Sequence, residues 1–179
     1  NKSIELKDGR SCIIRNGDAS DSKAVLSVFN QTHRETDFML SYPDESGFTV
    51  AEEADFLKEK SESDREIEIL AEVGGIVVGT AGISAVGSSY KLRPRAEYGI
   101  GILREYWGLG IGRSLTAACI ECAEKAGYAQ LELTVVADNS SAVALYESFG
   151  FREYGRNPRG FNSRISGWQE LILMRLELN

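Results

Sequence analysis

The chain has 179 residues, of which 42% are hydrophobic and 26% charged, enough for one globular domain with a sizeable core. Its net charge of −7 argues against a protein that binds nucleic acid by neutralising phosphates. No run of about 18 apolar residues is present, and residues 1–12 lack the apolar core of a signal peptide. We therefore expect a single cytoplasmic domain over residues 1–179, with neither nucleic acid nor membrane as a partner.

Strand character appears in six segments, at residues 11–15, 66–73, 76–86, 96–103, 129–136 and 167–178, with one or two strands at the C-terminal end. Helical spacing appears in four segments, at residues 18–36, 50–61, 111–126 and 139–149. Three consecutive antiparallel strands followed by a strand, a helix and a strand predict an α/β fold of the mixed-sheet (α+β) kind. We expect a central, mostly antiparallel sheet of six or seven strands, flanked by about four helices.

Local signals mark several of these boundaries. Asp18 or Ser20 is suited to cap the first helix. Pro43 and Gly47 predict a turn-rich connector over residues 41–49. The Gly74-Gly75 pair predicts a hairpin, because glycine takes positive φ at both turn positions without steric cost.

The three cysteines do not suggest a disulfide scaffold. Cys119 and Cys122 have a C-x-x-C spacing, but a structural zinc site needs four ligands, and only Cys12 and His33 remain as further candidates. A redox pair usually lies at a helix start, whereas these two lie inside a helical pattern. We expect them to pack in the core, and we expect no metal.

The segment YWGLGIGRSL, residues 106–115, places Gly108, Gly110 and Gly112 directly before a helix. A helix start has N–H groups without intrahelical partners and a partial positive charge, so it suits an anion such as phosphate. A tight turn that needs glycine only for its backbone angles remains the alternative. The dinucleotide and Walker A phosphate loops both fail, because Trp107, Arg113 and Leu115 stand where their patterns need other residues.

Together with its flanks, this loop resembles motif A of the GNAT superfamily of N-acetyltransferases, whose backbone N–H groups hold the pyrophosphate of acetyl-CoA. A second segment, DNSSAVALYESFGF at residues 138–151, is similar to motif B of the same superfamily, with Asn139 as the N-cap of a short helix. Both motifs, in order, cover about the last half of the chain. The first half agrees only in its order of elements. Trp107 departs from the Arg or Gln of the family pattern, and we expect its ring to pack.

The resemblance implies acetyl-CoA as co-substrate and direct attack by the acceptor amine, without an acyl-enzyme. A backbone N–H near Ile102 would polarise the thioester carbonyl. The residues that the resemblance assigns to the coenzyme are Ile102, Leu103, Arg104, Leu109, Gly110, Ile111, Gly112, Arg113, Ser114, Leu115, Asn139 and Tyr146.

Two catalytic residues follow from the resemblance. Tyr146 corresponds to the tyrosine that protonates the coenzyme A sulfur, with an aromatic packed beside the coenzyme as the alternative. Glu97 is the candidate base, because strand alternation places it with Gly99 and Gly101 on one bare face. A surface ion pair is its alternative. Thr134, at another common base position, cannot titrate usefully, and we expect His33 to be structural.

We therefore expect an N-acetyltransferase that acts on a primary amine, either a small amine or amino acid, or a protein N-terminus or lysine. A non-catalytic acyl-CoA-binding module is the alternative. Segments 33–45 and 156–168, the latter before the final strand, are the expected determinants of selectivity. The arginines between Arg152 and Arg164 are suited to bind an acidic substrate or the 3′-phosphate of the coenzyme. The alternative is that they are ordinary surface residues. A homodimer is compatible with the family, and no residue pattern specifies one.

Overall fold

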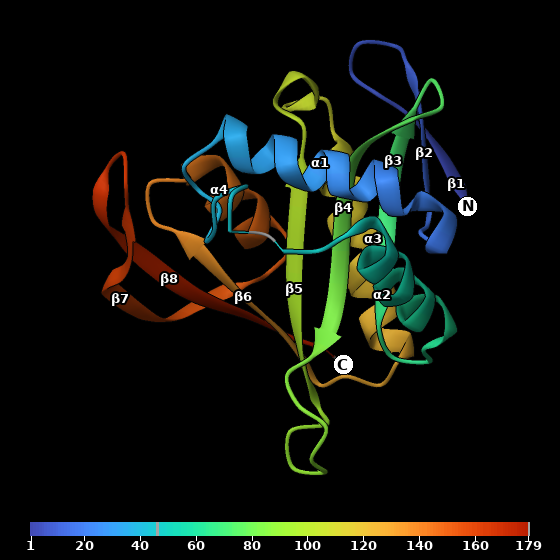
Figure 1. Ribbon diagram of the computed structural model, residues 1–179. Coiled ribbons are helices and arrows are strands. Elements are labelled where there is room, and N and C mark those ends of the chain that lie inside the picture. Colours follow the sequence, from blue (N-terminus) through green and yellow to red (C-terminus); the bar gives the residue numbers. More distant parts are fainter. Residues whose placement is uncertain (46, 179) are drawn as a thin grey trace.

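The computed structural model describes residues 1–45 and 47–178, so position 46 of the predicted connector and position 179 lie outside the described residues. Eight strands form one sheet in the order β1-β2-β3-β4-β5-β6-β8-β7 (Figure 1). Within the described residues, β5 and β6 are the one parallel pair, and all the other neighbours are antiparallel. The strands are β1 (Lys2–Glu5), β2 (Ser11–Asn16), β3 (Ile67–Val73), β4 (Ile76–Ala85), β5 (Arg95–Ile102), β6 (Gln130–Val136), β7 (Arg152–Ser163) and β8 (Gly167–Glu177). The mixed, mostly antiparallel sheet is confirmed.

The predicted number of six or seven strands is slightly too low. The N-terminal strand β1 was not predicted, because its sequence KSIE has one apolar residue and too little alternation. Most of segment 156–168, expected as part of a loop, belongs to the edge strand β7. Its pairing with β8 is interrupted twice by register shifts, which an edge strand tolerates but which blur a two-residue sequence pattern.

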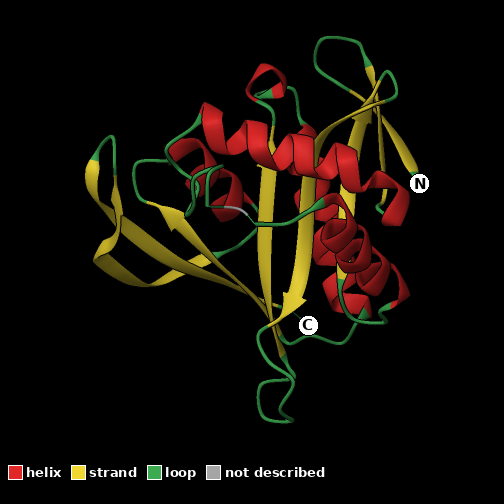
Figure 2. Cartoon of the chain, viewed as in Figure 1, coloured by secondary structure: helices red, strands yellow, loops and turns green. Residues whose placement is uncertain are grey.

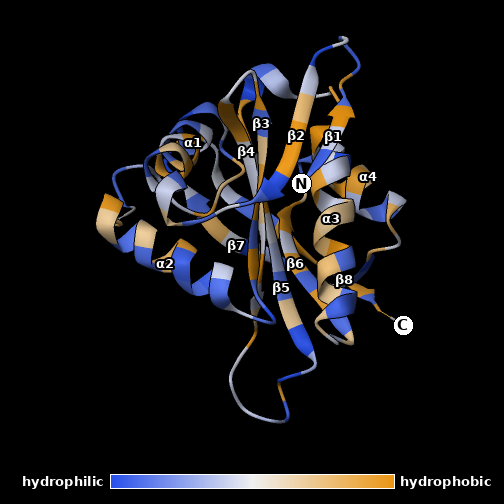
Figure 3. Ribbon diagram, turned by 90° about the vertical axis from the view of Figure 1, so that its right-hand side faces the viewer, coloured by the Kyte–Doolittle hydropathy of each residue, from blue (hydrophilic) through white to orange (hydrophobic). Residues whose placement is uncertain are grey.

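Four α-helices cover the two faces of the sheet (Figure 2). They are α1 (Ser22–Glu35), α2 (Val50–Glu62), α3 (Ile111–Lys125) and α4 (Ser140–Ser148). Two short 3-10 turns precede α1 and α3, namely η1 (Ala19–Asp21) and η2 (Arg104–Tyr106). Figure 3 shows α1 and α2 on one side of the sheet and α3 and α4 on the other. Asp18 caps η1 rather than α1, and Asn139 caps α4 as expected.

The larger hydrophobic core lies between the sheet and α3, and Cys119 is fully buried in it with Cys122 packed at its edge. Core packing of these two cysteines is thus confirmed. A smaller core under α1 and α2 is formed by Val25, Val28, Leu57, Leu70 and Val77. Among the residues that the structure describes, no helix is long and apolar enough to cross a membrane.

Candidate active site

The parallel strands β5 and β6 part shortly after they meet. Their pairing covers only three residue pairs and ends at Glu97 and Glu132, beyond which β6 leaves β5 at an angle (Figure 1). The N–H of Leu103 donates to the carbonyl of Val78 on β4, at 2.9 Å. Because N–H groups alternate sides along a strand, those of Ile100 and Ile102 point into the opening. Among the described residues, these N–H groups have no backbone partner, so one wall of the opening offers backbone donors.

The glycine loop lies at the wide end of this opening. Gly108 and Gly110 have φ values of 75° and 102°, which side chains rarely adopt, and Gly110 is the residue directly before α3. No side chain caps this helix start, so its first N–H groups remain available to a ligand. A Cβ atom at Gly112 would lie 3.3 Å from Leu145 of α4 and 3.4 Å from Ile102 of β5. The glycines thus serve backbone angles and close packing.

Two cationic side chains line the cleft at this loop. Arg113 donates to the Ser148 hydroxyl at 3.2 Å, and its guanidinium lies over the Phe149 ring. Lys7 lies in the turn between β1 and β2, whose backbone N–H donates to the Leu109 carbonyl at 3.2 Å. Sequence analysis missed Lys7, because it missed the hairpin that carries Lys7 to the loop.

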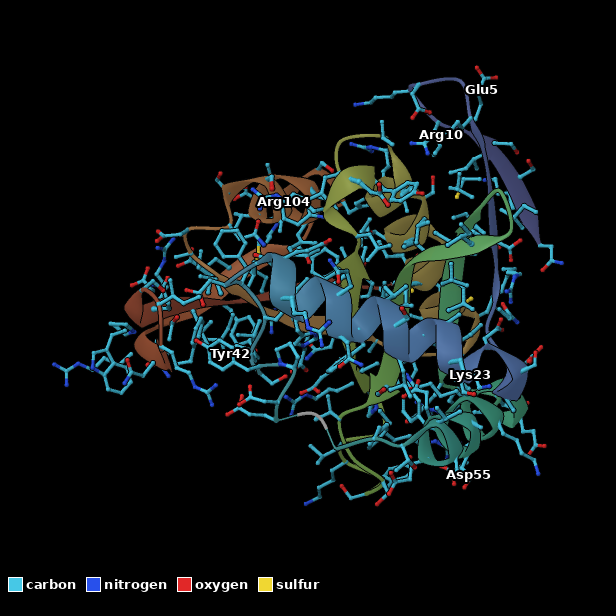
Figure 4. The ribbon with its side chains drawn as sticks, turned by 45° about the horizontal axis from the view of Figure 1, so that its top comes forward. Glu5, Arg10, Lys23, Tyr42, Asp55 and Arg104 are labelled. Carbon is cyan, nitrogen blue, oxygen red and sulfur yellow. The ribbon has the colours of Figure 1, made fainter. Side chains whose placement is uncertain are left out.

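Trp107 contacts the backbone of β5, and Arg104 contacts the Glu35 carboxylate. The Trp107 indole donates to the Ile102 carbonyl at 2.7 Å, although the residue stays 44% exposed and lines the cleft. The backbone N–H of Arg104 donates to Glu35 at the end of α1, at 2.7 Å; Figure 4 labels Arg104 at this point. The expectation that the Trp107 ring packs holds in part, since the Arg104 guanidinium also lies over the ring, 5.8 Å from its centroid.

Of the twelve residues assigned to the coenzyme, half line the cleft and half do not. Six of them line one cleft of about 1340 Å³, namely Ile102, Gly110, Gly112, Arg113, Asn139 and Tyr146. The side chains of Ile111 and Leu115 lie fully in the core, so these two residues can offer a ligand only backbone atoms. Leu103, Arg104, Leu109 and Ser114 do not belong to the lining. The cleft is therefore formed largely by backbone at this end.

Tyr146 of α4 lies in the wall of the cleft with its ring largely buried. The ring packs edge-on against Tyr98, with centroids 6.1 Å apart, and against Phe151 at 5.8 Å. Burial raises the pKa of its hydroxyl to about 12, because the phenolate would lose solvation. The hydroxyl hence keeps its proton at neutral pH and can act as a proton donor.

The two faces of β5 differ as the alternation predicted. The Tyr98 hydroxyl reaches the Thr116 hydroxyl on α3, at 2.9 Å, whereas a Cβ on Gly101 would face Thr32 and Met39 on the opposite side. Glu97 lies on the Gly101 face, exposed and within the cleft. In the described part of the chain its carboxylate makes no hydrogen bond, and its electrostatic partner Arg95 is paired with Glu132. The Glu97 carboxylate is therefore available to a ligand.

His33, the one histidine of the chain, also lines the cleft. Its ring stacks on Phe29 with centroids 3.8 Å apart, and its Nδ1 lies 2.7 Å from the Phe29 carbonyl. Burial lowers its pKa, so the neutral ring is favoured, and Nδ1 donates to that carbonyl. Both contacts fit the expected structural role.

The two segments expected to determine selectivity are joined by hydrogen bonds. The Ser163 hydroxyl donates to both Asp37 carboxylate oxygens, at 2.7 and 2.8 Å, and the Ser166 hydroxyl donates to the same carboxylate. The Arg164 N–H donates to the Tyr42 hydroxyl at 2.7 Å. In Figure 4, Tyr42 lies between α1 and the β7–β8 hairpin. We call these contacts, from Asp37 and Tyr42 to Ser163, Arg164 and Ser166, the latch.

The comparisons with known proteins agree with this geometry. A family model described as acetyltransferase (GNAT) family matches residues 29–151. N-alpha-acetyltransferase RimI of Mycobacterium tuberculosis is 41% identical over 108 residues, which are 59% of this chain and 63% of that protein. The [ribosomal protein bS18]-alanine N-acetyltransferase of Escherichia coli K12 is 37% identical over 82 residues, 46% of this chain and 55% of that protein. The chain thus spans less than two thirds of these relatives.

A GNAT-family acetyltransferase structure from Streptococcus pneumoniae matches with a TM-score of 0.88 and 30% identity, over 94% of this chain and 99% of that one. A putative acetyltransferase of Salmonella typhimurium, determined with its cofactor acetyl-CoA, matches in fold with a TM-score of 0.83 and 20% identity, over 94% of both chains. The family model covers more than half of the chain, and it includes the glycine loop, the strand opening and α4. By sequence and by fold, the chain belongs to the acetyltransferase (GNAT) family.

Proposed function

We propose that the protein transfers an acetyl group from acetyl-CoA to a primary amine, by direct attack within a ternary complex. One observation carries this proposal: the uncapped start of α3, the opening between β5 and β6, Tyr146 and Glu97 all border one cleft. Acetyl-CoA is the acetyl donor of GNAT enzymes. It would supply an activated thioester, and no metal is needed for that chemistry.

The chain offers each part of acetyl-CoA a group of matching chemistry. The N–H groups at the start of α3, with Arg113 and Lys7 nearby, suit the pyrophosphate. The inward N–H groups of Ile100 and Ile102 can bond the pantetheine amides, and one of them can stabilise the negative charge that develops on the thioester oxygen. The bare glycine loop lets the phosphates approach the backbone closely.

Glu97 and Tyr146 would move the protons. An amine must lose its ammonium proton before it attacks, and the free Glu97 carboxylate can accept it. The departing sulfur must gain a proton, and the Tyr146 hydroxyl, protonated at neutral pH, can supply it. Glu97 passes the ammonium proton to solvent. The attacking nitrogen loses a second proton to solvent as the amide forms, and Tyr146 regains from solvent the proton that it gives to sulfur, so the net reaction releases one proton.

The acceptor amine would enter the cleft beside the latch, from the side of β5 that α1 covers. The names of two relatives specify an N-alpha-acetyltransferase and a ribosomal-protein alanine N-acetyltransferase, which supports a polypeptide α-amino group as the first acceptor to test. A small amine or amino acid remains the second. A cytoplasmic location suits both acceptors.

Thiol release from acetyl-CoA tests the proposal against a panel of amino acids, their amides, simple amines and short peptides. We expect release that depends on one class of amine. Tight acetyl-CoA binding without thiol release on every amine of the panel would favour a non-catalytic acyl-CoA-binding module.

A further inference from the structure

On the sheet face that α1 and α2 cover, three aligned residues, two of them glycines, form a row across three neighbouring strands. The register aligns Glu68 on β3 with Gly82 on β4, and Gly82 with Gly99 on β5. A Cβ atom at Gly82 would overlap the Glu68 carboxylate, so this carboxylate lies over Gly82 and extends toward β5. Glu68, Gly82 and Gly99 all line the same cleft as Glu97.

The two glycines of β5 differ in the space beside them. A Cβ atom at Gly99 would meet nothing within 4 Å, whereas one at Gly101 would lie 3.6 to 3.7 Å from Thr32 and Met39. An acceptor nitrogen that approaches β5 from this side therefore has room over Gly99. There it lies between Glu97, two residues earlier on β5, and the Glu68 carboxylate.

Glu68 is held by two groups but keeps capacity for a third. Lys60 of α2 donates to Glu68 at 3.4 Å, and to the carbonyls of Ile83 at 3.1 Å and Ile67 at 3.4 Å. Thr80 on β4 also acts on Glu68, where it opposes the rise in pKa that burial causes. A carboxylate accepts about four hydrogen bonds, so it has room for a further donor such as an ammonium group.

The Lys60–Glu68 ion pair is largely buried. The two side chains are only 5% and 13% exposed, and burial raises the pKa of Glu68. A buried ion pair is often no more stable than apolar residues of the same size. Glu53 of α2 adds a further buried carboxyl nearby, whose pKa burial and Glu68 both raise. Perturbed groups of this kind in a cleft are typical of functional sites.

We infer that Glu68 binds the acceptor: its carboxylate receives the ammonium group of the substrate over Gly82 and Gly99. Lys60 holds Glu68 in place, and the proton that the ammonium later loses goes to Glu97. This inference rests on the proposed function and narrows it, because it specifies an acceptor that binds as a cationic primary ammonium.

Two substitutions test the role of Glu68. Glu68→Gln removes the charge, whereas Gly82→Ala keeps both charges and displaces the carboxylate by steric overlap. Glu72→Gln is the matched control, because Glu72 lies on the same strand but pairs with Arg15 and is not part of the cleft lining. Amine affinity is measured by calorimetry with tyramine and with alaninamide, on protein saturated with coenzyme A, and the KM for each amine by thiol release.

We expect both Glu68→Gln and Gly82→Ala to weaken amine binding by about tenfold or more, the value of one hydrogen bond to a charged group. The KM for acetyl-CoA should stay at its wild-type value, and Glu72→Gln should behave like wild type in every measurement. Glu68→Gln leaves Lys60 without its charged partner. If that prevents folding, the amine affinity of Gly82→Ala decides whether Glu68 binds the acceptor.

Wild-type amine affinity in a folded Gly82→Ala or Glu68→Gln variant would overturn the inference, and so would a wild type that binds neither amine. Different results would contradict the proposed function and the inference about Glu68. Amine binding that depends on Glu68 but leads to no thiol release would retain the inference and reject the transferase. Thiol release that does not depend on Glu68 would support the transferase and reject the inference about Glu68.

Discussion

The two ends of the cleft differ in the chemical groups that line them. The coenzyme end consists mainly of backbone N–H groups at α3 and β5, supplied by one continuous stretch that includes the glycine loop, with the side chains of Arg113 and Lys7 beside them. The acceptor end consists of side chains, and these come from α1, α2, β3, β5 and the β7–β8 hairpin. The latch alone joins Asp37 to Ser163 across 126 positions of the chain.

This difference follows from what each end has to bind. Pyrophosphate and amides are recognised by N–H groups, which any sequence supplies once glycines allow the backbone to turn. An amine is recognised by charge and shape, which only particular side chains provide. The coenzyme end can therefore tolerate many side-chain changes, whereas the acceptor end cannot, and the following substitutions test that contrast.

Tyr146→Phe should have the largest effect, because Tyr146 serves the step common to both ends. We expect kcat to fall by about a hundredfold with saturating acetyl-CoA, as is usual for loss of a general acid. Since burial raises the pKa of Tyr146 to about 12, wild-type kcat should not decline through phenolate formation until the pH approaches that value. Full turnover in Tyr146→Phe would reject its role as the acid.

Glu97→Gln should slow the reaction by about tenfold to a hundredfold near neutral pH. The loss should shrink toward about pH 10, where solvent deprotonates alkyl amines without help. The pH profile of kcat/KM for the amine, compared with that of wild type, measures this. A profile with the wild-type shape and height would remove Glu97 from the mechanism.

Gly110→Ala should raise the KM for acetyl-CoA by about tenfold, because a side chain at φ 102° costs roughly 1–2 kcal/mol and disturbs the start of α3. The KM for the amine should stay unchanged. Gly74→Ala is the control, since Gly74 also has positive φ but lies in the β3–β4 turn. A similar loss of coenzyme affinity in both variants would mean that general destabilisation is the cause.

Asp37→Asn should have the smallest effect and should act on the acceptor end alone. The variant weakens the hydrogen bonds from Ser163 and Ser166, and we expect about a threefold increase in the KM for the amine. The KM for acetyl-CoA serves as the internal control. An equal change in both KM values would show that the latch supports the whole cleft rather than the acceptor end.

Much of the fold could be predicted because its signals are local. The Gly74-Gly75 turn, the Asn139 cap and the alternation along β5 each depend on residues close in sequence, and the structure has all three. The strand β1 escaped prediction, and β7 was left open as a second strand at the C-terminal end, without bounds. Both are polar edge strands, whose identity comes from pairing with β2 and β8.

The sequence by itself determined the family, the glycine loop and the placement of Asn139, Tyr146 and Glu97 on their elements, since each depends on spacing within one segment. Only the tertiary structure decided which side chains meet. It brought Lys7 to the loop, joined Asp37 to Ser163, and laid Glu68 across Gly82 toward Gly99. Such contacts depend on strand register and helix packing between distant segments, and no local pattern records them.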